Sequence, residues 1–278
     1  MQSHPTRSYR TVIDATQSWK AIDLQEILRY RDMLYFRVVS AYKAEHRQMV
    51  LSYLWVVIDP LIKIVFCAIV FGSVVRVRTG SIPYLPFNAS GMVAWAFVST
   101  CLNNSISSLG NEAILLQKIY FPRIFIPLVP CLAQIPNLLL NLALTIVLLA
   151  FMGYPPTWAA LLLPVPIILF IILSTGTGLM LSTFALQYRD VRKLWSGLMQ
   201  FLIYSVPVAY PATAIPEKFR GWYFLNPLAA DIETFRACLL NQPIPWRWLA
   251  LSAVTSLALL HLGGIVFRRH EAAIVDTV

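Results

Sequence analysis

Long apolar runs alternate with short polar segments over most of the chain. A helix that crosses the hydrocarbon core of a bilayer needs about 20 mostly apolar residues. Six runs come close to or exceed that length, at residues 51–75, 87–107, 124–152, 158–186, 194–210 and 248–267. The second run is the most polar, because Asn88, Asn103 and Asn104 interrupt it. The pattern predicts an all-α polytopic membrane protein with six transmembrane helices in residues 51–278.

An amphipathic pattern precedes the first apolar run. Its apolar positions recur at helical spacing, at Leu24, Ile27, Leu28, Leu34, Tyr35, Val38, Val39 and Tyr42. Such a stripe suits a helix that lies in the plane of the membrane interface, and it also suits a helix packed on a soluble partner. Basic residues beside the membrane entry favour the interface. We therefore expect residues 1–50 to be a cytoplasmic N-terminus that carries an interface helix in contact with membrane lipid.

Composition supports the membrane assignment. Hydrophobic residues make up 58% of the chain and charged residues 13%, and the mean hydropathy is +0.66, which lies far outside the range of ordinary soluble domains. With the N-terminus inside, most of the 22 lysines and arginines fall on inner segments, as cytoplasmic loops require. We expect a multi-pass protein of the bacterial inner membrane with both termini cytoplasmic. Anionic lipid accounts for the net charge of +9, so no nucleic acid partner is expected.

Catalytic signatures are absent from the sequence. No G-x-x-x-x-G-K-[ST] loop occurs, so the chain is not expected to hydrolyse ATP by itself. The four cysteines form no CxxC pair, and the four histidines are scattered along the chain. We predict no catalytic, cofactor-binding or metal-binding residue. Residues 1–50 also lack the short apolar core of a cleavable signal peptide.

Charged and aromatic side chains lie within the apolar runs. Asp59 and Lys63 are four residues apart and share a helical face, where they can form an ion pair. Such a pair can belong to a substrate path or proton relay, or simply neutralise itself inside the bundle. Aromatic rings near span ends are usually interfacial anchors. The candidate channel-lining residues are Trp55, Asp59, Lys63, Phe66, Trp95, Phe201, Tyr204 and Tyr210.

Two connections between the runs have a pattern of their own. Residues 109–123 read as a short amphipathic helix that ends at Pro122, which suggests an element that docks on a partner outside the membrane. The outer segment 211–246 reads as two short helices, too short to span, with Pro and Asn at the breaks. A shallow re-entrant pair is the favoured interpretation. A loosely structured surface loop is the alternative.

Several short motifs occur in a recognisable order and spacing. They are SYLW at 52–55, QKIYFPR at 117–123, QYRDVR at 187–192, IPEK at 215–218, LNP at 225–227 and FRR at 267–269. Together they resemble the membrane subunits of ABC transporters that export polysaccharides, of the O-antigen and teichoic acid type. The resemblance covers nearly the whole chain from about residue 26. It implies a homodimer of six-span subunits with two separate cytoplasmic ATP-binding subunits, which would hold ATP and Mg²⁺.

The resemblance also implies roles for particular residues. The inner helix at about 110–120 would be the coupling helix, through Asn111, Glu112, Ile114, Leu115 and Lys118. A second ATPase contact would use Tyr188, Arg189, Asp190 and Arg192. The outer helices would form a gate with Pro216, Trp222, Asn226 and Pro227. The sequence departs from the family at Asp59 and Lys63 and at residues 88–90, which leaves the channel lining open.

The substrate implied is a lipid-linked polysaccharide, an O-antigen-like glycan on undecaprenyl diphosphate. A teichoic acid, a capsule polysaccharide or another lipid-linked substrate is the alternative. A secondary transporter would need ion-coupling charges on several spans or an inverted repeat, and neither is evident. A membrane enzyme of glycan assembly would need clustered outer carboxylates or histidines. The outer segments offer Glu217, Asp231 and Glu233.

Overall fold

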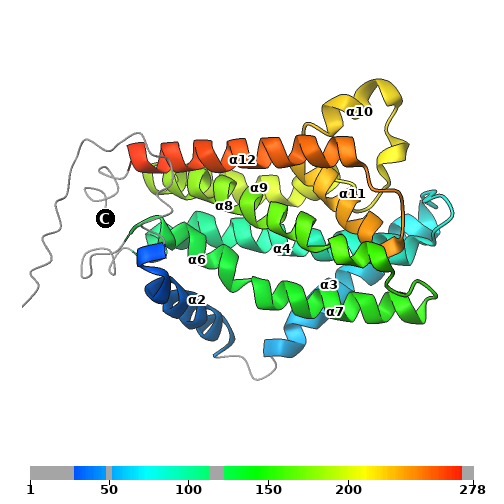
Figure 1. Cartoon of the computed structure of the whole chain (residues 1–278), viewed down its shortest axis with the longest axis horizontal. Coiled ribbons are helices and arrows are strands. Elements are labelled where there is room, and N and C mark those ends of the chain that lie inside the picture. The colour runs from blue at the N-terminus through cyan, green and yellow to red at the C-terminus, as the bar shows by residue number, and fades with distance from the viewer. Residues whose placement is uncertain (1–27, 48–51, 113–121, 271–278) are drawn as a thin grey trace, which may run out of the picture.

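A computed structural model describes residues 28–47, 52–112 and 122–270 (Figure 1). Within these ranges the chain forms helices and no strand. The long helices run side by side along one direction, and α2 lies obliquely at one end of the bundle (Figure 1). We call the end where α4 and α12 finish the inner end, and the opposite end, which carries α10, the outer end.

The helices follow one another with short connections. They are α2 (Arg31–His46), α3 (Ser52–Cys67) with the π-helical η1 (Ala68–Val74), α4 (Tyr84–Asn111), α6 (Phe125–Ala133), α7 (Ile135–Phe151), η2 (Trp158–Leu162), α8 (Pro164–Gln187), α9 (Arg189–Leu202), η3 (Ile203–Ser205), η4 (Ala212–Ala214), α10 (Glu217–Tyr223), α11 (Pro227–Leu240) and α12 (Trp246–Arg269).

Among the residues that the structure describes, five helical stretches are long and apolar enough to cross a membrane. They are Leu54–Val74, Tyr84–Asn111, Phe125–Phe151, Trp158–Gln187 and Trp246–Arg269. This confirms a polytopic all-α membrane protein and five of the six expected spans. The run at 194–210 is not among them, because α9 has 14 residues and ends at Leu202. Its first turns are charged, and Pro207 and Pro211 cannot continue a helix.

The third span is a broken helix. α6 and α7 meet at Gln134, with Pro130 inside α6 and Pro136 in the first turn of α7. A proline removes a backbone donor and clashes with the preceding turn, so two prolines close together account for the break. The offset between α6 and α7 is visible in Figure 1.

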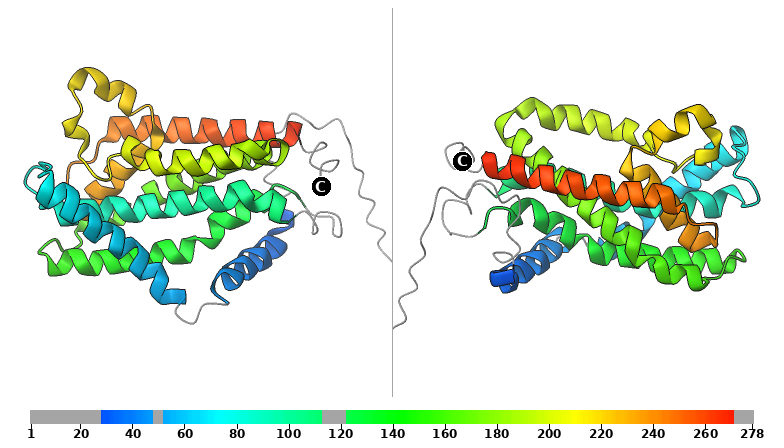
Figure 2. Two further views of the ribbon diagram at one scale, coloured as in Figure 1. Left: turned by 180° about the vertical axis from the view of Figure 1, so that it is seen from behind. Right: turned by 45° about the horizontal axis from the view of Figure 1, so that its top comes forward.

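Small residues let the last span pack closely on α8. A Cβ added at Gly176 would lie 2.5 Å from the backbone nitrogen of Leu260, and Gly263 faces Gly176 across the same contact. A Cβ added at Gly178 would lie 2.9 Å from the side chain of Ser105 in α4. The glycines of α8 therefore form a helix-packing face. α4 lies between the α8–α12 pair and α7, as both views of Figure 2 show.

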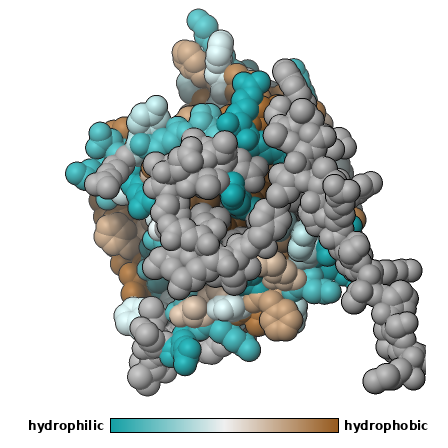
Figure 3. All heavy atoms as spheres, turned by 90° about the vertical axis from the view of Figure 1, so that its left-hand side faces the viewer, coloured by the Kyte–Doolittle hydropathy of each residue, from teal (hydrophilic) through white to brown (hydrophobic). Residues whose placement is uncertain are grey.

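Apolar side chains remain exposed along α3 and α7, for example Phe66 and Val147. Exposed apolar surface of this kind is expected for helices that face lipid or another protein. Seen from the inner end, hydrophilic side chains are prominent among the coloured atoms (Figure 3). The bundle thus has apolar sides and a polar end.

Candidate functional site

The inner end of α4 leads into the predicted coupling segment. α4 continues to Asn111, and the N–H of Glu112 donates to the carbonyl of Ser108 at 3.1 Å. The start of the pattern at 109–123 is therefore the last turn of a span and not the beginning of a separate helix. Residues 113–121, with Ile114, Leu115 and Lys118, lie outside the described residues. The docking helix itself stays a prediction.

Glu112 connects this segment to the interface helix. Its carboxylate forms an ion pair with Arg37 of α2, and both side chains are largely buried. Burial lowers the pKa of the Arg37 guanidinium. A partly buried pair is screened less by solvent than a surface pair, so it joins α2 firmly to the end of α4. Sequence spacing gave no sign of this contact, because the two residues lie far apart in the chain.

The second predicted inner contact lies beside the first. Tyr188 is exposed and extended between α8 and α9, and Asp190 and Arg192 are exposed in the first turns of α9. The Arg192 guanidinium packs against Gly110 of α4, where it occupies the place of a Cβ. Arg189 begins α9. The structure therefore brings the α9 start and the α4 end together. A partner that reached one of them would be near the other.

The candidate channel-lining residues divide into exposed and buried groups. Trp55 and Phe66 on α3 are exposed, and Asp59 accepts from Lys63 at 2.6 Å on the same exposed helix. Phe201 and Tyr204 at the end of α9 are also exposed. The Tyr210 hydroxyl donates to the carbonyl of Tyr204 at 2.7 Å.

Trp95 differs from the other members of this set. It is 8% exposed and packs in the main hydrophobic core of the subunit. Its side chain therefore lies largely within the subunit, and its channel-lining role stays a prediction. The apolar composition of this run predicts a helix, but it does not show which side of the helix faces the core.

An exposed apolar stripe follows α9. Leu194, Leu198 and Phe201 are exposed and lie on one face, at intervals of four and three residues. α9 packs on α8 and α4 along one side. A stripe of this kind on a helix with few neighbours marks an interaction surface.

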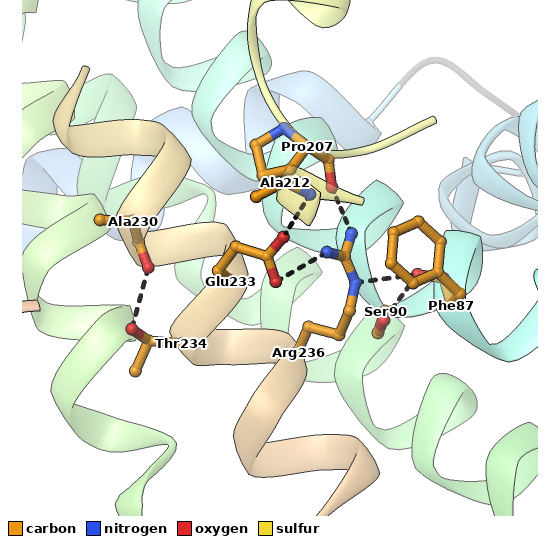
Figure 4. A network of polar contacts seen from close by, with 8 residues as sticks. All are labelled: Phe87, Ser90, Pro207, Ala212, Ala230, Glu233, Thr234 and Arg236. Atoms are coloured by element: carbon orange, nitrogen blue, oxygen red, sulfur yellow. Dashed lines mark hydrogen bonds and ion pairs between the residues drawn. The ribbon is translucent and has the colours of Figure 1, made fainter. Parts of the chain in front are cut away.

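A fully buried arginine organises the outer end. Arg236 of α11 donates from Nε to the carbonyl of Phe87 at 3.2 Å and from Nη2 to the carbonyl of Pro207 (Figure 4). Its Nη1 lies 3.2 Å from Glu233 Oε2, and the guanidinium carbon lies 3.7 Å from the centre of the Phe87 ring. The cation is thus paired, hydrogen-bonded and stacked, which offsets the cost of burying it.

The same network holds the irregular segment between η3 and η4. The other oxygen of Glu233 accepts from the backbone N–H of Ala212 at 3.1 Å (Figure 4). The Tyr84 hydroxyl donates to the carbonyl of Ala209 at 2.8 Å. A Cβ at Gly91 would lie 2.6 Å from Arg236 Nη2, so glycine is required there. Backbone without helical hydrogen bonds is tolerated at membrane depth only where protein groups satisfy it.

The two predicted outer helices are present. Pro216 precedes α10, and the side chain of Asn226 caps α11 by accepting from the N–H of Leu228 at 3.2 Å, with Pro227 as the first residue of the helix. Trp222 on α10 is exposed. α11 is buried over most of its length. The expectation of a loose loop is therefore wrong, and the gate role stays a prediction.

The outer carboxylates do not form a cluster. Glu217 is exposed on α10, Glu233 pairs with Arg236, and Asp231 accepts from the Ser252 hydroxyl at 2.6 Å inside the bundle. Among the described residues no group of three His, Cys, Asp or Glu side chains is placed to hold a metal ion. These carboxylates have structural partners, and their arrangement does not support an enzyme of glycan assembly.

Comparison with known proteins fits this arrangement. Residues 38–240 match the model of the ABC-2 type transporter family. The chain is 27% identical to the O-antigen export system permease protein RfbA of Myxococcus xanthus over 256 residues, which cover 90% of this chain and 97% of that protein. It is 26% identical to a protein of the same name from Klebsiella pneumoniae, over 82% of this chain and 87% of the relative. Permeases of this family pair with ATP-binding subunits. The chain belongs to the ABC-2 type transporter family, as a multi-pass membrane permease subunit.

Proposed function

We propose that this chain is the permease subunit of an ATP-driven exporter that moves a lipid-linked polysaccharide across the bacterial inner membrane, with both chain termini in the cytoplasm. The similarity to O-antigen export permeases over nearly the full length of both chains carries the proposal. An O-antigen-like glycan on undecaprenyl diphosphate is the favoured substrate. Teichoic acid and capsule polysaccharide remain the alternatives within the same class.

The open faces of the subunit support a homodimer. Phe66 on α3 and the α9 stripe present large apolar side chains that a single copy leaves uncovered. Two copies related by a two-fold axis would cover such faces with the same faces of the partner. Exposed aromatic rings at Trp55, Phe201 and Tyr204 would then offer sugar rings apolar contacts along the path between the copies.

The inner end supports coupling to two copies of a separate ATP-binding subunit. Closure of those subunits on ATP is a rigid-body movement. The Glu112–Arg37 ion pair and the packing of Arg192 on Gly110 connect the predicted docking segment to α2 and α9. Force applied at this segment would therefore reach three helices at once.

The experiment that tests the function removes this gene from its host. We expect lipid-linked glycan to accumulate inside the cell and surface glycan to disappear, both restored by the wild-type chain. An affinity-tagged copy should retain an ATP-binding subunit during purification. A partner defective in ATP binding is the control, because export should then fail although the complex assembles.

Three results would contradict the proposal. Surface glycan that persists in the deletion strain would exclude this chain from its export. Export that continues with the defective partner would favour a secondary transporter. Loss of glycan synthesis, with no lipid-linked intermediate inside, would favour an enzyme of assembly.

A further inference from the structure

α2 is fastened to the bundle at two points on one helical face. Arg37 pairs with Glu112, and Glu45 accepts a hydrogen bond from Gln134 Nε2 at 2.7 Å. Ala41 lies between them, four residues from each, so all three share the face toward the bundle. Because alanine has a short side chain, space remains under the middle of the helix.

That space consists of two adjoining cavities. One of about 430 Å³ is lined by Ala41, by the inner half of α4 and by the α6–α7 break. The other, of about 240 Å³, is bordered by the end of α2 together with α3, α4 and α7. Glu45 and Gln134 line both cavities. We call the combined space the α2 groove.

The groove is lined by apolar side chains interleaved with a row of uncharged polar side chains. Its amides are Asn103, Asn104, Asn111, Gln134, Asn137 and Asn141. Ser107, Ser108 and Thr100 add hydroxyls, and the exposed ring of Trp55 stands at one border. Neither cavity has a lysine or arginine among its described lining residues, and His46 lines the smaller one. The carboxylates of Glu45, Asp59 and Glu112 are partnered by Gln134, Lys63 and Arg37.

One amide in the groove is incompletely satisfied. Asn137 is 9% exposed and lines the smaller cavity. Its Nδ2 donates to Gln134 Oε1 at 2.8 Å, but its buried Oδ1 has no hydrogen-bond partner among the described groups. A buried acceptor that is left unpaired is unfavourable. The unpaired oxygen of Asn137 points to a ligand that brings a hydrogen-bond donor.

The lining selects among the chemical groups of a lipid-linked glycan. A diphosphate is disfavoured, because the described lining offers no lysine or arginine and contains three carboxylates. Amides both donate and accept, and hydroxyl groups do the same, so a row of amides matches a polyhydroxyl ligand. An ammonium group would meet carboxylates that already have partners and would leave the amide donors unmatched.

We propose that the α2 groove is a sugar-binding site, which holds a neutral, polyhydroxyl segment of the exported glycan beneath α2. This inference rests on the proposed function for the identity of the natural ligand. The unpaired Asn137 oxygen accepts a sugar hydroxyl, the amides of α4 and α7 bind neighbouring hydroxyls, and Trp55 contacts the apolar face of a ring.

The test uses the full-length chain in lipid nanodiscs and two photoreactive probes with the same alkyl chain. One probe is an alkyl maltoside, and the other is a primary alkylamine. Ala41→Leu fills the groove, and Ala44→Leu adds the same side chain at an exposed position of the same helix. We expect the maltoside probe to label peptides of α2 and α4 in the wild type and in Ala44→Leu. Labelling should fall about tenfold in Ala41→Leu.

Asn137→Leu gives a second variant that separates binding from folding. It removes the unpaired acceptor while keeping a side chain of similar size, so the melting temperature should change little. Maltoside labelling should nevertheless fall. A purely structural Asn137 would show the reverse, with a lower melting temperature and unchanged labelling.

The outcomes separate this site from the proposed function. Labelling by the alkylamine alone, by neither probe, or equally in all variants would overturn the sugar site. Ala41→Leu that exports glycan at the wild-type rate after losing maltoside labelling would also overturn it. A wild type that binds maltoside in the groove but exports no glycan in cells would refute the export function and leave the site standing.

Discussion

The first two spans are neighbours in sequence and in space, yet their environments are opposite. In the apolar window of the α3 span 17% of the residues are buried, against 78% in that of α4. α4 is nevertheless the more polar helix. The hydrocarbon chains of lipid cannot hydrogen-bond to a side chain, so polar residues turn toward the protein interior. Asn88 shows this directly, because its Nδ2 donates to the carbonyl of Ile64 in α3 at 3.2 Å.

This difference shows that apolar composition identifies a membrane-spanning helix but does not show how much of that helix is buried in the bundle. Apart from the Asp59–Lys63 pair, α3 exposes mainly apolar side chains, among them Ile62, Val65 and Phe66. A helix of this kind meets lipid or a second protein. α4 carries the internal contacts, including the carbonyl of Phe87 that accepts from Arg236.

The largest expected effect comes from breaking the buried charge network that joins α11 to α4. Arg236→Leu leaves Glu233 buried without its cation, which should cost about 3–5 kcal/mol. Thermal unfolding of the purified protein measures this as a lower melting temperature. Adding Glu233→Leu to Arg236→Leu should recover part of the loss, since the unpaired carboxylate is gone.

Arg220→Leu is the matched control for that experiment. Arg220 lies 3.6 Å from the exposed Glu217 at the same helical spacing, i to i+3. Exposed ion pairs contribute little. Equal melting temperatures for Arg220→Leu and Arg236→Leu would contradict the role assigned to the buried network.

A matched pair of phenylalanines compares the two spans directly. Phe97 on α4 is 5% exposed, and Phe66 on α3 is 63% exposed. Phe97→Ala should lower the free energy of unfolding by about 2 kcal/mol or more, because it leaves a cavity inside the protein. Phe66→Ala should leave the melting temperature of the monomer nearly unchanged, since lipid can fill the space. A larger loss for Phe66→Ala would show that a partner copy covers this face.

The ion pair at the inner end of α4 should have an intermediate effect. Glu112→Lys places a lysine beside Arg37 and should lower the free energy of unfolding by about 1–2 kcal/mol. It should also weaken co-purification of the ATP-binding subunit. The exchanged pair, Arg37→Glu with Glu112→Lys, should restore stability. If Glu112→Lys retained both the partner and export, a coupling role for this charge would be excluded.

The smallest effect is expected for the ion pair on α3. Asp59 and Lys63 are both more than half exposed, so replacing them with Asn and Gln together should change the unfolding free energy by less than about 1 kcal/mol. A fall in glycan export at unchanged stability would place the pair on the substrate path. Unchanged export and stability would identify a self-neutralising pair.

The sequence predicted those features that depend on local pattern. Five spans follow from apolar length, and α10 and α11 follow from Pro216, Asn226 and Pro227 at their boundaries. In each case the information lies within a few residues of the feature.

Features that depend on distant residues were not predicted. The burial of Arg236 depends on carbonyls of Phe87 and Pro207, which are far away in the chain. The run at 194–210 was predicted to span from its apolar length, but α9 ends at Leu202 and Pro207 interrupts the run. The sequence of a helix does not show which neighbour Trp95 meets, so its channel-lining role stays a prediction.

The Gly176–Gly263 contact also bears on how the protein is made. α8 leaves the ribosome long before α12, and its glycine surface cannot be covered until the final span has entered the membrane. During that interval Gly176 lacks the close contact with the backbone of Leu260 and with Gly263 that α12 supplies. The closing step of biogenesis is therefore the docking of the last helix, and a chain released before residue 263 would lack the surface that completes the bundle.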